Sequence, residues 1–497
     1  MNGTTEKTVD YDVIIVGSGI SGINSAYRVQ TQVPNASYTI LEARGGLGGT
    51  WDFFKYPGIR SDSDLHTFGF PWRPWTERRA IADGPSIVRY LKESAEEYGI
   101  DKKIKYNHKV ISADWSSDTL NWTLEVQHNG ETKTMRGRFL ILGTGYYNYD
   151  EPMETKIPDL ERFKGTTIHP QFWPEDLDYS NKKMVIIGSG ATAVTLLPVV
   201  AKTASHVTML QRSPSYVFSL PNADPLGEFY HRFLPVYWAH KLDRYRFLIF
   251  GFLFYHFCRL FPTTARGVLA KATKKQLPPS VLFDPHFVPA YNPWEQRLCL
   301  CPDGDFYEAM RSGKADIVTG RIKTVTENGI LLESGESITA DIICTATGLK
   351  LKIAGGMTFT VDGQKLHVPD KFLWKGIMLQ DLPNAAFVLG YTNASWTLGA
   401  DATAQLVTRL MNHMRKNGFA AAVPRVQKPE AMTSQPVLNL KSTYLQNAAS
   451  SMPKAGNVGQ WRPRSNYFRD IHEAKRGDIT TGLEFHKEHL ANGGLKS

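Results

Sequence analysis

Residues 11–22 read YDVIIVGSGISG. The first six form a short run rich in β-branched side chains, which predicts a buried parallel strand. The run leads directly into Gly17, Gly19 and Gly22, spaced GxGxxG. In this pattern the first glycine permits a tight turn, the second allows close approach of a pyrophosphate, and the third lets the following helix pack on the strand. The stretch therefore predicts a dinucleotide site, with the helix N-terminus and the Ser21 hydroxyl facing the phosphates.

An acidic residue follows at the expected distance. The apolar run Tyr38–Leu41 predicts a second strand, and it ends in Glu42, twenty residues after Gly22. A carboxylate at this point can accept hydrogen bonds from a ribose 2′-hydroxyl. Strand, glycines, helix and acid in register indicate dinucleotide binding far more strongly than the glycines alone.

The pattern recurs in residues 183–194, where the strand MVII precedes GxGxxA. The next apolar run, His206–Leu210, is followed not by an acid but by Gln211, Arg212 and Ser213. A cation there suits a 2′-phosphate, which predicts NADPH rather than NADH; the alternative is that Arg212 is an ordinary surface charge. The turn residues of this second unit are Gly188, Ser189, Gly190, Ala191, Thr192 and Ala193.

Two further runs, FLILGTG at 139–145 and ADIICTATG at 340–348, read as strands that end in glycine turns and connect the two units. We expect an α/β protein with two Rossmann-like dinucleotide-binding domains, one interrupting the other, and a mostly helical insertion. The predicted domains are residues 10–150 for the first part of one nucleotide domain, 160–213 and 294–348 for the other, 214–293 for the insertion, and 349–497 for the second part of the first domain and a C-terminal tail.

The composition of the chain restricts the class of protein, the partners and the metal sites that can be expected. A chain of 497 residues, with 42% hydrophobic and 21% charged residues, predicts a folded protein of several domains. The net charge of +9 comes without a basic run interleaved with aromatic residues, so we expect no nucleic-acid partner. The N-terminal residues carry no signal-peptide pattern, which predicts a cytoplasmic protein. No metal site is predicted from the four cysteines, which lack metal-finger spacing and suggest free thiols: Cys258, Cys299, Cys301 and Cys344.

One apolar stretch needs its own explanation. Residues 247–258, FLIFGFLFYHFC, lie within the basic segment 241–275 and are too few for a bilayer span of roughly 20 residues. One interpretation is a buried helix of a lid or of a dimer contact. The other is a peripheral membrane contact, or a patch through which lipophilic substrates enter. The sequence carries no prediction of oligomeric state.

Two long motifs lie between and beside the glycine turns. Residues 163–174, FKGTTIHPQFWP, match FxGxxxHxxxWP, and residues 49–62, GTWDFFKYPGIRSD, match GxWxxxxYPGxxxD. Both resemble the signatures of type I Baeyer-Villiger flavin monooxygenases. Further segments, such as YNPWEQRLC at 291–299 and GYTNASWTL at 390–398, resemble the ethionamide-activating monooxygenase branch. The resemblance extends over nearly the whole chain.

This resemblance implies FAD and NADPH as cofactors, and it implies particular contacts. The NADPH contacts are the turn at 188–194, Arg212, Ser213 and His169. Of these, His169 is expected to couple NADPH binding to domain movement, with simple packing and direct acid-base work as the alternatives. Several family members have a lysine at the position of Gln296, so Arg212 is expected to carry more of the NADPH discrimination here. The implied FAD contacts are Ser21, Glu42, Thr50, Trp51, Asp52, Asp62 and Val110.

Arg297 corresponds to the active-site arginine of that family, which stabilises the negatively charged peroxyflavin. A guanidinium keeps its proton, so a nearby carboxylate can orient it without neutralising it, and Asp62 is the candidate. Two alternatives stay open: Arg297 as a structural ion pair, and Asp62 as a residue that holds the FAD loop.

The resemblance implies an oxidoreductase that uses molecular oxygen to convert ketones, expected to be lipophilic, to esters or lactones through a C4a-peroxyflavin. The nearest alternative is a thioether S-oxygenase that uses the same flavin intermediate. A disulfide reductase needs a redox cysteine pair, typically with four residues between the two, and the cysteines here lack that spacing. A flavin-bound redox sensor without turnover is the third alternative.

Overall fold

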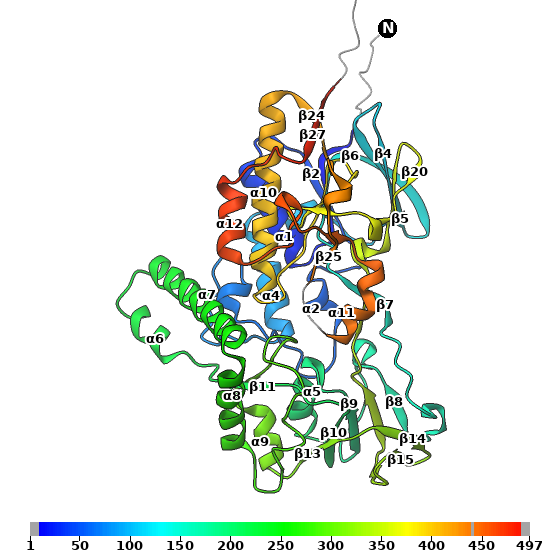
Figure 1. Ribbon diagram of the computed structural model, residues 1–497, viewed down its shortest axis with the longest axis vertical. Helices are drawn as coiled ribbons and strands as arrows, with labels where there is room; N and C mark the ends of the chain where they lie inside the picture. The colour runs from blue at the N-terminus through cyan, green and yellow to red at the C-terminus, as the bar shows by residue number, and fades with distance from the viewer. Residues whose placement is uncertain (1–8, 439–441, 489–497) are drawn as a thin grey trace, which may run out of the picture.

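The computed structural model describes residues 9–438 and 442–488, so the ends of the predicted N-terminal segment and tail lie outside the described residues. Two sheets, each covered by helices, form two lobes along the long axis of the molecule (Figure 1). The chain enters the first lobe, crosses to the second, and returns to the first (Figure 1).

The first lobe is built on an 11-stranded sheet with the main order β20-β19-β4-β5-β6-β1-β2-β3. Strand β1 lies between β2 and β6 and is parallel to both, with Val13 opposite Tyr38 and Phe139. It is buried because its β-branched side chains face helices on one side and a second apolar cluster on the other. The strands are β1 Tyr11–Val16, β2 Tyr38–Leu41, β3 Ile104–Lys105, β4 Lys109–Ser116, β5 Asn121–His128, β6 Glu131–Leu142, β19 Thr358–Val361, β20 Gln364–Lys365, β21 Leu373–Trp374, β22 Met378–Leu379 and β23 Ala385–Phe387.

Helices cover the first sheet, and segments from opposite ends of the chain meet there. The long helix α10 packs between α1 and α12 (Figure 1). Strand β24 pairs with β27, and Trp461 of the tail is buried in the same core. The elements are α1 Ile20–Gln32, α2 Thr50–Phe53, α3 Leu65–Phe68, α4 Gly84–Glu97, α10 Trp396–Asn417, β24 Phe419–Pro424, β25 Gln435–Pro436, α11 Thr443–Ala448, β26 Lys454–Ala455, α12 Tyr467–Arg476 and β27 Leu483–Lys487.

The second lobe holds a five-stranded parallel sheet in the order β13-β10-β9-β17-β8. Its central strand, β9, leads through the second glycine turn into α5, as the repeated pattern predicts. The predicted fold class, an α/β protein with two Rossmann-like units, is confirmed. The elements are β8 Thr166–Ile168, β9 Lys183–Ile187, α5 Ala191–Val200, β10 His206–Gln211, β12 Cys299–Pro302, α9 Asp305–Arg311, β13 Ala315–Thr319, β14 Ile322–Thr326, β15 Gly329–Leu332, β16 Ser337–Thr339 and β17 Ile342–Thr345.

The two crossings between the lobes run side by side. Strand β7 (Tyr147–Pro152) follows β6, β18 (Leu349–Leu351) follows β17, and the two pair antiparallel at the junction of the lobes. The two runs predicted as connecting strands are therefore β6 and β17. The residue limits of the predicted domains stay a prediction.

The insertion is mostly helical, as expected. After β11 (Val217–Leu220), which pairs with β12, come α6 (Pro225–His231), α7 (Val236–Leu260) and α8 (Pro262–Gln276). Helices α6 and α7 project from the side of the molecule (Figure 1, green).

Residues 247–258 are only partly buried within this chain, so their interpretation as a buried helix of a lid is wrong, whereas the dimer contact stays a prediction. Leu248 and Cys258 are buried, but Ile249, Phe250 and Leu253 are 49%, 51% and 60% exposed. The reason is that α7 packs along one side, mainly against α3, α6 and α8. Among the described residues no single helix has both the length and the apolar character to cross a membrane; α7 and α8 meet these criteria only as a pair, bent by 115°.

Candidate active site

A cavity of about 550 Å³ opens where β1 and β2 end, at the carboxyl edge of the first sheet. This is the position at which parallel α/β sheets bind their ligands. Residues from distant parts of the chain, between Val16 and Trp396, meet in it. The predicted site residues that line it are Gly17, Gly19, Ser21, Glu42, Thr50, Trp51, Asp62, Val110 and Arg297.

The glycine turn has the geometry that a pyrophosphate needs. Gly17 has φ +98°, and a Cβ there would lie 2.7 Å from the carbonyl oxygen of Gly143. A Cβ on Gly22 would lie 1.8 Å from the carbonyl oxygen of Gly17, so α1 packs on β1 only because this position is glycine. Helix α1 begins after Gly19, which has no side chain to cap its first-turn N–H groups. These donors and the helix dipole suit an anion, and the cavity therefore fits FAD.

Glu42 is held at the edge of this cavity by backbone and side-chain donors. Its Oε2 accepts hydrogen bonds of 2.8 Å from both the amide and the hydroxyl of Ser18, and its Oε1 accepts one of 2.9 Å from the Arg44 amide. A carboxylate offers about four acceptor sites, which leaves capacity for a ribose hydroxyl. The position and orientation suit the ribose contact predicted from the sequence.

Asp62 and Arg297 approach the cavity from different lobes. The Arg297 side chain is fixed by an Nη2 hydrogen bond of 2.7 Å to the carbonyl oxygen of Tyr391. Asp62 is half-buried, and its desolvation raises its pKa to about 6, while the charges of Arg60 and then Arg297 act in the opposite direction. Arg60 is itself paired with Asp305 of the second lobe. Asp62 thus lies in the field of two guanidinium groups, whose positive charge favours the ionised carboxylate while desolvation disfavours it.

This desolvation predicts that Asp62→Asn raises the free energy of unfolding at pH 7.5. The folded-state pKa of about 6 lies above the ordinary 3.8, so folding disfavours the ionised carboxylate. The contribution of Asp62 to stability is therefore complete below pH 4 and is lost as the pH rises through 6. The difference corresponds to an upper limit of about 3 kcal/mol at pH 7.5. Guanidinium denaturation at pH 4 and 7.5 measures it.

Asp118→Asn, at an exposed carboxylate, is the matched control for that comparison. Its unfolding free energy should change little at either pH. Equal destabilisation of Asp62→Asn at both pH values would mean that Asp62 stabilises the fold in its charged form.

Two predicted flavin contacts lie beside the cavity rather than in its lining. Asp52 on α2 pairs with Arg44, with 2.9 Å between Oδ2 and Nη2. Gly22 packs beneath the turn. Arg44 lines the cavity in place of Asp52, so the carboxylate's observed role is to hold this arginine.

Sequence reasoning missed several polar and aromatic groups in the lining. Trp396, at the start of α10, donates its indole N–H to Ser21 Oγ at 2.9 Å, and the Tyr146 ring stacks on it. Tyr149 OH lies 3.0 Å from Thr50 Oγ1. The available signal for Trp396 was its place in the segment GYTNASWTL, which resembles the family without revealing where the indole points.

The second glycine turn lies at the carboxyl edge of the second sheet, outside the cavity of the first lobe. A Cβ on Gly188 would lie 2.3 Å from the carbonyl oxygen of Ala346, whereas a Cβ on Gly190, just before α5, would meet open space. Arg212 and Ser213 follow β10 and are exposed. The geometry repeats that of the first turn and fits a second dinucleotide.

The two signature motifs lie where the lobes touch. His169 follows β8; its Nδ1 accepts a hydrogen bond of 3.1 Å from the Gln171 amide, and burial lowers its pKa. The Gln171 side chain donates to the carbonyl oxygen of Asn148 in β7 at 2.8 Å. In the other motif, a Cβ on Gly58 would lie 2.5 Å from a methyl carbon of Val199 on α5. Both motifs therefore connect the lobes.

Comparison with known proteins agrees with this architecture. The Flavin-binding monooxygenase-like family model matches residues 78–225, and the NAD(P)-binding Rossmann-like domain model matches residues 15–83. The chain is 48% identical to the FAD-containing monooxygenase EthA of Mycolicibacterium smegmatis over 487 residues, which cover 97% of this chain and 99% of EthA.

Two solved structures share the fold at low sequence identity. Oxidized steroid monooxygenase bound to NADP has a TM-score of 0.72 and 20% identity, with 96% of this chain and 99% of that chain covered. The OTEMO complex with FAD and NADP has a TM-score of 0.71 and 18% identity, with 96% and 100% covered. The match to EthA extends over nearly the whole of both proteins, so the chain belongs to the family of FAD-containing monooxygenases.

Proposed function

We propose that the chain is an FAD- and NADPH-dependent Baeyer-Villiger monooxygenase that converts lipophilic ketones to esters or lactones. The overall reaction consumes ketone, O2, NADPH and a proton, and it gives ester, NADP+ and water. The observation that carries the proposal is that Arg297, which follows the insertion, lines the same cavity as the first glycine turn and Asp62. The similar structures named above include a complex with FAD and NADP, which supports the choice of cofactors.

Bound FAD, once reduced, supplies the electrons and the activation of oxygen. The chain's own contribution is electrostatic. Arg297 keeps its charge at any working pH and is held by the Tyr391 carbonyl, so it offers fixed positive charge to negative charge that develops on the reacting oxygen atoms. Asp62 orients this field; its pKa is raised by desolvation, but at about 6 it is still below neutral pH, so the carboxylate stays mostly ionised there and the arginine keeps its proton.

We assign the preference for NADPH over NADH to Arg212 of the second lobe. Arg212→Ala should lower the ratio of kcat/KM for NADPH to that for NADH by about 10- to 100-fold, because one charge-assisted contact to a 2′-phosphate contributes about 1.5–3 kcal/mol. Steady-state kinetics with both coenzymes measures the ratio. Arg321→Ala, at another exposed arginine of the second lobe, is the control. A ratio that stays at the parent value would make Arg212 an ordinary surface charge.

The choice between carbon and sulfur oxygenation is tested by direct competition. The FAD-loaded protein receives NADPH and equal concentrations of 2-dodecanone and dodecyl methyl sulfide, whose chains have similar length and apolar area. The proposal predicts that ester exceeds sulfoxide and that ketone alone gives one ester per NADPH consumed. Sulfoxide as the main product would make the chain a thioether S-oxygenase, and NADPH consumption with neither product would contradict both functions.

The surface of the projecting insertion supports the proposal that the substrate is lipophilic and is taken up at this part of the protein. Between Phe229 and Phe283 the one acidic residue is Asp243, which is buried, while cations alternate with exposed aromatic and aliphatic side chains. Trp238 is 58% exposed. Apolar side chains with interspersed Lys and Arg fit the headgroup region of an anionic bilayer, so we infer that α6 and α7 contact such a surface. The exposed cations of this segment are Arg232, Lys241, Arg259, Lys271, Lys274 and Lys275.

Sedimentation with liposomes tests the membrane contact. The double variant Trp238→Ser/Leu253→Ser should bind phosphatidylglycerol vesicles about 30-fold or more weakly than the parent, because two large apolar side chains no longer insert. Phosphatidylcholine vesicles should bind the parent weakly, since they lack net charge. Val458→Ser, at an exposed apolar residue of the tail, should bind like the parent. Unchanged sedimentation of the double variant would contradict the contact.

A further inference from the structure

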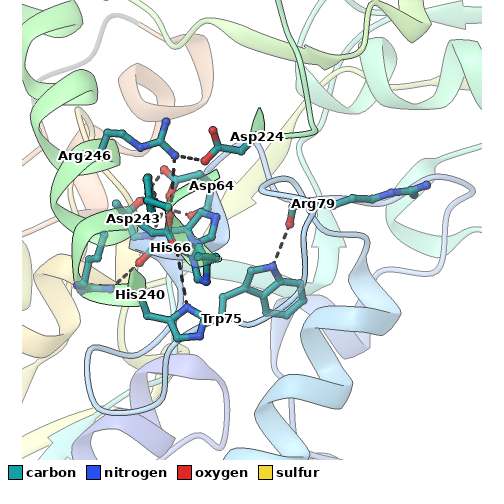
Figure 2. A network of polar contacts seen from close by, with 12 residues as sticks. Asp64, His66, Trp75, Arg79, Asp224, His240, Asp243 and Arg246 are labelled. Carbon is teal, nitrogen blue, oxygen red and sulfur yellow. Dashed lines mark hydrogen bonds and ion pairs between the residues drawn. The ribbon is translucent and has the colours of Figure 1, made fainter. Parts of the chain in front are cut away.

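A cluster of three histidines and one aspartate lies where the insertion docks on the first lobe (Figure 2). Its members are His66 of α3, His231 of α6, and His240 and Asp243 of α7, and they are called the His-Asp cluster below. The three imidazoles converge on one carboxylate oxygen. Asp243 Oδ2 lies 2.7 Å from His231 Nε2, 3.8 Å from His240 Nδ1 and 3.9 Å from His66 Nδ1.

One buried nitrogen of this cluster has no hydrogen-bond partner. The hydroxyl of Tyr230 donates to Asp243 Oδ1, which leaves Oδ2 to the histidines. His240 Nδ1 is buried without a hydrogen-bond partner, on a side chain that is 10% exposed. A buried ring nitrogen without a partner is costly, and it is aimed at the carboxylate that one imidazole already contacts. The His240 ring nitrogen therefore faces the Asp243 carboxylate without a hydrogen bond of its own.

The cluster has charged neighbours of both signs. Arg246 pairs with Asp224 and also lies 3.8 Å from Asp243 Oδ1, through the Nη2 nitrogen in both contacts, and the Asp64 carboxylate lies nearby (Figure 2). The positive charge of Arg246 is thus shared with a second carboxylate outside the cluster.

We propose that His231, His240 and Asp243 form a binding site for Zn²⁺, beside His66. One nitrogen or oxygen of each of the first three lies within 4.8 Å of the others. Zn²⁺ binds such atoms at about 2.0–2.2 Å, so tetrahedral ligands are separated by roughly 3.3 Å and small side-chain rotations suffice. Imidazole with one carboxylate suits Zn²⁺ better than Mg²⁺ or Ca²⁺, which prefer oxygen ligands.

The site would join the insertion to the first lobe. Its three ligands come from α6 and α7, and His66 of α3 lies against them, with 3.9 Å between its Nδ1 and Asp243 Oδ2, next to the loop that carries Asp62. The Arg244 side chain already docks α7 by donating to the carbonyl oxygens of His66 and Gly69 at 2.9 and 3.0 Å. The ion therefore adds to an existing contact. The His231 side chain is 32% exposed, which provides a route for the ion from solvent.

The proposal is tested by metal analysis of the untagged, FAD-loaded protein. After treatment with a chelator, the protein receives ZnCl2 and is desalted, and zinc is measured by mass spectrometry. One zinc per chain is expected, with a higher Tm than the chelator-treated protein. His240→Ala should lower retained zinc by about tenfold or more, since it removes a ligand. This variant should fold, because His240 Nδ1 has no hydrogen bond to lose.

A matched control separates this site from histidine pairs in general. His206 and Asp316 form an exposed pair with 3.2 Å between Nε2 and Oδ2, so His206→Ala removes a histidine beside a carboxylate elsewhere. It should retain one zinc per chain. Parent protein that retains no zinc, or His240→Ala that retains as much as the parent, would overturn the proposal.

Discussion

Replacing Arg297 by alanine should leave FAD bound and reducible by NADPH but lower the rate of ester formation by about 100- to 1,000-fold, the effect typical of removing one donor that stabilises a reacting anion. The expectation follows from position. Arg297 lines the cavity of the first lobe and is fixed by the Tyr391 carbonyl, whereas the glycine turns lie on separate loops and do not depend on it. Stopped-flow reduction and product analysis measure the two steps separately.

The control for this variant is Arg78→Ala, whose side chain is 86% exposed, and it should form product at the parent rate. Arg297→Lys should recover part of the activity, because a lysine keeps the charge but lacks the planar guanidinium. Ester formation by Arg297→Ala at the parent rate would remove Arg297 from the reaction and leave it as a structural residue.

Gly22→Ala should abolish FAD binding and lower the Tm markedly. The added methyl group would lie 1.8 Å from the carbonyl oxygen of Gly17, a backbone atom that cannot move without displacing the turn. Overpacking of this kind costs about 1–3 kcal/mol or more, and here it also shifts the N-terminus of α1, which faces the phosphates. The ratio of flavin to protein absorbance, together with the Tm, measures the effect.

Gly267→Ala is the matched control, because a Cβ at Gly267 in α8 meets open space and the helix accepts alanine well. It should keep full flavin content and an equal or higher Tm. Full flavin content in Gly22→Ala would show that the turn does not need glycine there, and would weaken the assignment of this cavity to FAD.

The nucleotide units could be predicted because their signals are local. A strand, a glycine turn and a helix follow one another within about 20 residues, and each glycine is required by a close backbone approach. The position of Arg297 could not be derived this way. It lies 275 residues beyond Gly22 in the sequence, and only the resemblance to a family indicated that the two would share a cavity.

Other parts of the site depend on how distant segments dock. In the sequence, nothing distinguishes Trp396, at the start of a long helix, from the other aromatic residues. Only the packing of α10 on α1 brings its indole to Ser21. The exposure of Phe250 and Leu253 follows from the direction in which α7 leaves the body of the protein. His66 and His240 are likewise brought together by docking, so cysteine and histidine spacing gave no sign of the cluster that they form.

The most direct test of the proposed reaction is mass spectrometry of the product formed from 2-dodecanone by FAD-loaded protein with NADPH under isotopically heavy oxygen gas. We predict an ester that carries one heavy oxygen atom in the newly formed C–O–C linkage. Oxidation of NADPH with hydrogen peroxide as the sole oxygen product, or an ester without the heavy atom, would contradict the proposed insertion of oxygen into a ketone.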